Sequence, residues 1–208
     1  MSGVVVLDLH YLPCLDYVAA LLQHERVLIE AAESFQKQSY RNRCYIRQTN
    51  QRMLLSVPTQ RTQRGMPIRE VRVQTGGDWQ RIHIQSLQSA YGKAPFYAHY
   101  APAILDILTD PPPLLFDLNK RLLTTCLHLM GAMPQIDYTQ QFIVHYPEPV
   151  MDLRQAISPK RPDIFAHRPY WQVFGDSFMT NLSIVDALFC LGPEAITYLK
   201  GSTSNKTR

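Results

Sequence analysis

The residues best suited to chemistry gather in one short segment, residues 35–43, which reads FQKQSYRNR. Its cations are separated by aromatic and amide side chains and by no acidic residue. An Arg guanidinium can bind carboxylate or phosphate through two parallel hydrogen bonds, and Lys adds a compact positive charge. Aromatic rings can stack on a ligand ring, and amides can orient its hydroxyls. The segment therefore predicts a site for an anionic ligand. Its candidate binding residues are Lys37, Tyr40, Arg41, Asn42 and Arg43.

The charge of the chain is distributed unevenly around this segment. The 208 residues have a formal net charge of +4, yet no Asp or Glu occurs from residue 34 through residue 69. Eight of the 21 Lys and Arg residues fall in that stretch, so the rest of the chain is net acidic. Such an asymmetry favours an anionic partner. An ordinary solvated basic loop would have the same composition, and composition alone does not separate the two interpretations.

His83 is a second candidate, because a neutral imidazole near pH 7 can act as a general base or acid. It falls on a stripe at helical spacing that runs from Trp79 to Tyr91 and follows Asp78, a good N-cap. A histidine hydrogen-bonded within the core would show the same pattern. Asn119 is a polar residue in the middle of another predicted helix, where an exposed side chain is the commoner outcome.

Several other classes of site are not indicated. The chain has no GxGxxG, Walker, GxSxG or HExxH motif, so a dinucleotide site, a P-loop, a nucleophile elbow and a metal site are not predicted, and any cofactor is unknown. The four Cys residues are scattered singly, which indicates a reducing cytoplasm. No signal peptide is recognised, and no apolar run approaches the about 18 residues of a membrane span. We expect a cytoplasmic protein without a membrane span.

The elements that must position these residues follow an α/β pattern. Residues 4–9 and 26–30 are predicted to be buried strands on either side of a helix over residues 15–24, which makes a parallel βαβ unit. Residues 44–48 and 52–57 are predicted to form a hairpin. The fold class is therefore α/β, with a mixed β-sheet built on this unit plus the hairpin. Helices dominate the C-terminal half.

Other elements are predicted with less regular patterns. Residues 59–67 are polar and predict a loop with a solvated or ligand-facing surface. We expect one domain over residues 1–200 and a disordered tail over residues 201–208. The remaining predicted elements are a half-buried strand over 68–74, a helix over 95–108 that breaks or restarts at Pro102, a helix over 114–130, a strand over 142–146, a proline-rich segment over 147–169 and two helices over 183–190 and 193–200.

The predicted topology supports a ligand site at residues 35–43. Ligands of parallel α/β sheets bind beyond the carboxyl ends of the strands, and this segment follows the second strand. His10, Tyr11 and Pro13 follow the first strand and would emerge at the same edge. We expect the two loops to face one crevice, in which His10 and Tyr11 could meet Lys37.

A set of short motifs follows one another in order along most of the chain. They are Tyr11-Leu12-Pro13, Phe35-Gln36-Lys37 with Asn42-Arg43, Leu55-Ser56-Val57-Pro58, Trp79 and His83 preceding Tyr91, Ala94-Pro95-Phe96, and Asn119. In this order and spacing they resemble the WbqC-like family. Members often begin the first loop with a Gln-Pro pair, where this chain has Leu9-His10. The last part, Asn181–Phe189 followed by Gly192-Pro193, resembles the ending of a Bacteroidetes-type branch.

The resemblance implies a role in O-antigen or other surface-polysaccharide assembly, with transfer of glycine or a similar group. We therefore expect a transferase acting on an activated sugar, whose partner is a phosphorylated or carboxylated small molecule such as a nucleotide sugar. The alternative is a non-catalytic protein that binds nucleic acid or another polyanion, which the modest net charge does not favour. The expected catalytic residue is His83, and the expected substrate-binding residues are Tyr11, Pro13, Lys37, Tyr40, Arg41, Asn42, Arg43, Trp79, Tyr91 and Asn119.

Overall fold

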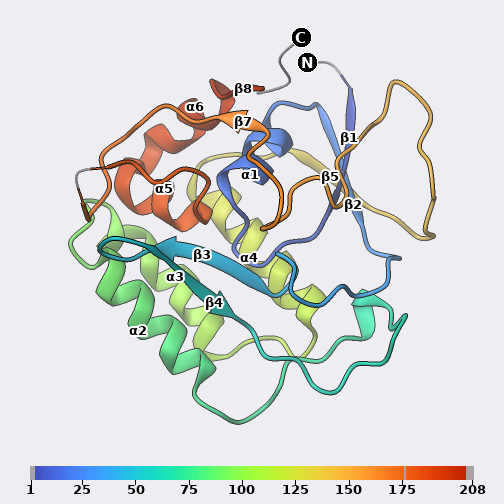
Figure 1. The fold of residues 1–208 in the computed structure, drawn as a ribbon, viewed down its shortest axis with the longest axis horizontal. Helices are drawn as coiled ribbons and strands as arrows, with labels where there is room; N and C mark the ends of the chain where they lie inside the picture. The colour runs from blue at the N-terminus through green and yellow to red at the C-terminus, as the bar shows by residue number, and fades with distance from the viewer. Residues whose placement is uncertain (1–2, 176, 205–208) are drawn as a thin grey trace.

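The βαβ unit at the start of the chain is confirmed by a computed structural model, which describes residues 3–175 and 177–204 (Figure 1). Strands β1 (Val4–Asp8) and β2 (Arg26–Glu30) run parallel, with Val5 opposite Val27. Helix α1 (Leu15–Leu22) connects them and is buried along most of its length. The β-branched run of β1 forms a strand that is buried on both faces, as expected for a parallel sheet.

The main sheet has four parallel strands in the order β5-β2-β1-β6. Strand β5 (Gln135–Tyr138) pairs with β2, and the short β6 (Met151–Asp152) pairs with β1. The prediction of a strand over residues 142–146 was wrong, because that stretch is a loop and the strand lies earlier. The apolar residues that suggested a strand, Phe142 to Val144, are exposed rather than packed in the sheet.

The predicted hairpin is confirmed, but it forms a sheet of its own. Strands β3 (Arg43–Arg47) and β4 (Arg52–Ser56) are antiparallel, and β3 contacts α2 (Trp79–Tyr91), which in turn packs against α3 (Tyr97–Thr109) (Figure 1). The strand predicted over residues 68–74 was wrong. Its first residues form the 3₁₀ turn η1 (Ile68–Glu70), and the following residues make only isolated bridges.

Helices dominate the second half, as predicted. Helix α4 (Leu115–Leu129) contacts η1, α3 and α5 (Ile184–Leu191). The predicted break at Pro102 was wrong, because α3 runs through this residue. Proline removes one backbone donor, but the buried face of α3, which includes Ile104 and Leu108, holds the helix in place.

The C-terminal elements pack on the βαβ unit. The 3₁₀ turn η2 (Gly192–Glu194) leads into α6 (Ala195–Lys200), and α1 contacts both α5 and α6. Strands β7 (Phe165–Ala166) and β8 (Thr203–Ser204) form an antiparallel pair. Part of the predicted tail is therefore a strand, and residues 205–208 lie outside the described residues. The four cysteines are buried and free, and no helix in the described residues is long and apolar enough to cross a membrane.

Candidate anion-binding site

Buried charge concentrates at the carboxyl edge of the parallel sheet. Asp8 is the last residue of β1, and Glu33 follows β2. The Arg41 guanidinium lies between them, with Nη1 3.0 Å from Asp8 Oδ2 and Nε 2.7 Å from Glu33 Oε1. All three residues are at most 5% exposed. Arg41, predicted to hold a ligand, is therefore committed to an ion-pair network within the core.

The two loops that were predicted to face one crevice do lie side by side. The Tyr11 backbone N–H donates to the Tyr40 carbonyl at 2.8 Å, which ties the loop after β1 to the segment after β2. Asn119, from the middle of α4, is buried and donates through Nδ2 to the Arg41 carbonyl at 2.7 Å. Asn119 thus positions the cationic segment from beneath.

The network sets the charge of each carboxyl group differently. The nearby His10 and Arg41 hold the pKa of Asp8 well below its usual range, although burial opposes them. Burial raises the pKa of Glu33 to about 7, with Arg41 opposing the shift and the charges of Asp8 and Glu30 adding to it. Asp8 is therefore the fixed anion of the network, and Glu33 is its proton-exchanging group near neutral pH.

A second arginine closes the same edge of the sheet. Arg154, just after β6, lies 2.9 Å from Glu30 Oε2 through Nη1 and also pairs with Asp152. The rings of Phe142 and Tyr146 lie against its guanidinium, each with its centroid 4.9 Å from Cζ. This contact anchors the loop that follows β5 over the edge of the sheet.

A cleft of about 330 Å³ opens beside the cationic segment. Lys37, Arg43 and Arg61 contribute to its wall, and within the described residues none of the three has an acidic partner. Three buried polar atoms of the lining residues, Asn42 Oδ1, Arg43 Nε and Thr62 Oγ1, have no hydrogen-bond partner. We call this opening the cationic cleft. Its lining residues are Phe35, Lys37, Gln38, Asn42, Arg43, Thr59, Gln60, Arg61 and Thr62.

A second opening also borders this segment. It measures about 320 Å³ and has Glu33 among its lining residues, so we call it the acid pocket. Phe35 lines both the cationic cleft and the acid pocket. The remaining lining residues of the acid pocket are Ala32, Ser34, Gln36, Phe142 and Gln155.

His83 occupies a different environment from the two openings. It is 2% exposed, its Nδ1 lies 2.8 Å from the Tyr11 hydroxyl, and the Trp79 ring meets it edge-on. Burial lowers the pKa of His83 to about 4, with a hydrogen bond to the Ser56 backbone opposing the shift. The imidazole is therefore neutral at pH 7, but it lines neither the cationic cleft nor the acid pocket. Its role as a base stays a prediction.

The other predicted substrate-binding residues divide into wall and support. Lys37, Asn42 and Arg43 line the cationic cleft. Tyr91 is buried and accepts from the Arg47 backbone N–H at 3.0 Å, and the Pro13 carbonyl accepts from a backbone N–H of α5. The predicted residues that do not line the cationic cleft are Tyr11, Pro13, Tyr40, Arg41, Trp79, Tyr91 and Asn119.

Sequence reasoning missed three residues of these walls. Arg61 and Thr62 belong to the polar loop that was predicted to be solvated or ligand-facing. The polar composition of the loop was a signal, but it did not single out these two residues. Glu33 lies in the loop that follows β2, at the edge where ligands of parallel sheets bind. That position was an available signal for Glu33, but its burial and raised pKa come only from the tertiary packing.

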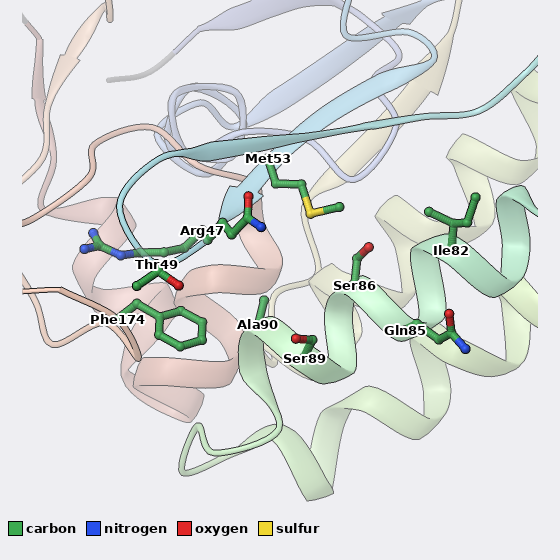
Figure 2. A pocket seen from close by; sticks show the side chains of 10 residues that line it. Arg47, Thr49, Met53, Ile82, Gln85, Ser86, Ser89, Ala90 and Phe174 are labelled. Carbon is green, nitrogen blue, oxygen red and sulfur yellow. The ribbon is translucent and has the colours of Figure 1, made fainter.

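A third cavity, of about 300 Å³, lies at the far end of the hairpin (Figure 2). Met53 reaches into it from β4, while Ser86 and Ser89 face it from α2. Arg47 runs along its wall, but the Arg47 guanidinium donates through Nη1 to Gln172 Oε1 at 2.6 Å and to the Ser177 carbonyl at 2.8 Å. The cationic cleft is therefore the better anion site, since Lys37, Arg43 and Arg61 have no acidic partner in the described part of the chain and Arg43 Nε has no hydrogen-bond partner there.

Comparison of the sequence with known proteins shows which family the chain belongs to. The chain is 26% identical to the uncharacterised protein Rv1507c of Mycobacterium tuberculosis, and the alignment covers 96% of this chain and 98% of that protein. No solved structure matches the chain. The model of the WbqC-like protein family matches residues 9–161, which include the cationic cleft and the acid pocket, whereas the later segment that resembles a Bacteroidetes-type branch lies beyond the match. The chain belongs to the WbqC-like protein family.

Proposed function

We propose that the chain is a transferase that holds the phosphate of an activated sugar in the cationic cleft. A single observation carries this proposal, namely that Lys37, Arg43 and Arg61 meet in one cleft and have no acidic partner among the residues that the structure describes. Cations without partners repel one another, and an anionic ligand relieves that repulsion. The unpaired Arg43 Nε and Thr62 Oγ1 supply donors for phosphate oxygens, and Asn42 Oδ1 can accept from a sugar hydroxyl.

The surroundings of the cleft support sugar chemistry in particular. Phe35 offers a ring for one face of a sugar, and Gln38 and Gln60 add amides to the wall. Lys37 and Arg43 would also neutralise the charge that develops on a departing phosphate or on a transferred acyl group. This assignment agrees with the role in surface-polysaccharide assembly that the family resemblance implies. The transferred group is proposed to be of the glycyl or acyl type.

Phosphate binding is expected to depend on Arg43 and not on positive charge in general. We expect Arg43→Gln to weaken the binding of glucose 1-phosphate by about tenfold or more, because it removes a charge-assisted hydrogen bond. Isothermal titration calorimetry at constant ionic strength measures the change. Arg64→Gln is the matched control, since Arg64 is an exposed cation of the same stretch that does not line the cleft. The control is expected to change the affinity by less than about twofold.

Equal losses from Arg43→Gln and Arg64→Gln would contradict a defined site and would indicate diffuse attraction of anions. In that case the polyanion-binding alternative gains support. Titration with single-stranded RNA at two salt concentrations then provides a direct measurement, because binding to a polyanion weakens steeply as salt rises.

A further inference from the structure

The cationic cleft and the acid pocket flank one side chain, Phe35, and carry opposite charge. We propose that the two openings together bind one molecule that is negative at one end and positive at the other, a phosphorylated amino sugar. Its phosphate lies in the cationic cleft, and its ammonium group lies in the acid pocket beside Glu33. This inference rests on the proposed function and names the substrate class of that site.

The balance of charge at the edge of the sheet favours a cation in the acid pocket. Four carboxyl groups meet there, and they pair with the guanidinium groups of Arg41 and Arg154 and with the imidazole of His10. The carboxyl groups therefore outnumber the basic groups paired with them. Of these four residues Glu33 lines the pocket, and its two carboxylate oxygens also accept from the Arg41 guanidinium. The four carboxyl groups are those of Asp8, Glu30, Glu33 and Asp152.

The walls of the acid pocket suit an amino sugar as well as a simple cation. Phe35 and Phe142 supply two aromatic rings, and the face of an aromatic ring attracts a cation. Arg154 Cζ lies 4.9 Å from the centroid of the Phe142 ring, so this ring already contacts one cation. Gln36 and Gln155 add amide groups that can bond to sugar hydroxyls.

Glu33 can also prepare the amine for reaction. The proton of the ammonium group passes to a Glu33 carboxylate oxygen, which leaves a neutral amine with a free electron pair and a neutral carboxylic acid. A carboxyl group whose pKa is near 7 exchanges protons readily at neutral pH. Arg41 keeps Asp8 as its anionic partner when Glu33 becomes neutral, so the buried guanidinium does not lose all compensation.

The test compares two ligands that differ only at one carbon of the sugar. Glucosamine 1-phosphate carries an ammonium group where glucose 1-phosphate carries a hydroxyl. We expect the wild-type chain to bind glucosamine 1-phosphate about tenfold or more tightly than glucose 1-phosphate, because one ligand gains a charge-assisted hydrogen bond. Isothermal titration calorimetry at pH 7 gives both dissociation constants. In Glu33→Gln this preference is expected to fall to within about twofold, with the affinity for glucose 1-phosphate retained.

The outcomes separate this inference from the proposed function. If both ligands bind the wild type equally, the acid pocket does not take an ammonium group, although the phosphate site stands. If neither ligand binds, the phosphate site fails and this inference fails with it.

Phe142→Leu is a second variant that keeps every charged group in place. It should reduce the affinity for glucosamine 1-phosphate more than the affinity for glucose 1-phosphate, and an equal effect on both ligands would count against the aromatic contact.

Discussion

Replacement of Arg41 by alanine is expected to lower the free energy of unfolding by about 3–5 kcal/mol at neutral pH. The Arg41 guanidinium bridges Asp8 and Glu33 in a part of the core where each residue is at most 5% exposed. Its removal leaves both carboxyl groups buried without the guanidinium, with His10 as the remaining partner of Asp8, so much of the cost of desolvating them is no longer compensated. Urea unfolding followed by circular dichroism measures the difference.

Arg26→Ala is the matched control for this prediction. Arg26 Nε also lies 2.7 Å from a carboxylate, that of Asp137, but the two side chains are 55% and 40% exposed. Water screens such a pair, and its loss is expected to cost at most about 1 kcal/mol. The loss in the free energy of unfolding caused by Arg41→Ala should also be smaller at pH 5 than at pH 8, because the carboxyl groups of Asp8 and Glu33 can take up protons in acid. If Arg41→Ala lowers the free energy of unfolding no more than Arg26→Ala does, Arg41 does not stabilise the edge of the sheet.

The second large effect is a dependence of stability on pH that comes from His83. The pKa of His83 is lowered to about 4 in the folded chain, whereas an exposed histidine has a pKa near 6.5. Between these two pH values the unfolded chain binds the proton more tightly than the folded chain, so acid favours unfolding. His83 therefore contributes stability that is present above pH 6.5 and is lost as the pH falls toward 4. The size of the loss is about 3 kcal/mol.

His83→Gln isolates this contribution. The variant is expected to be less stable than the wild type at pH 7, because the contact with the Tyr11 hydroxyl is altered. As the pH falls from 6.5 to 4, the free energy of unfolding of the wild type should drop by about 3 kcal/mol relative to that of the variant. The titration of Glu33, whose raised pKa works in the opposite direction over this range, is common to both chains and cancels in the comparison. A gap that stays constant with pH would mean that His83 titrates alike in the folded and unfolded chains.

The stability prediction for Arg41 and the affinity prediction for Arg43 together bear on how the site is assigned. Arg41 carries its charge inside the core, so its loss is expected to appear first as lost stability. Arg43, only two residues away, carries its charge in the cationic cleft, so its loss is expected to appear as lost affinity. Measuring both properties in both variants therefore distinguishes a residue that supports the site from a residue that contacts the ligand.

Much of the fold could be predicted because its signals are local. The apolar run of β1, the following helix and the run of β2 predicted a parallel βαβ unit, and the structure confirms it. The two short strands joined by polar residues predicted the hairpin, which is also confirmed. Residues 68–74 were misjudged because alternation of apolar and polar residues does not require a partner strand. Residues 142–146 were misjudged because exposed and buried apolar residues look the same in a sequence.

The sequence by itself determined that the first third of the chain is cationic and that the motifs belong to the WbqC-like family. Only the tertiary structure decided which of the cations are available to a ligand. Asp8 comes from a distant part of the chain to pair with Arg41, while no acid approaches Arg43 within the described residues. The physical reason is that burial and pairing depend on contacts between segments far apart in sequence. Those contacts set the charge of Glu33 and of His83, which residue types alone do not specify.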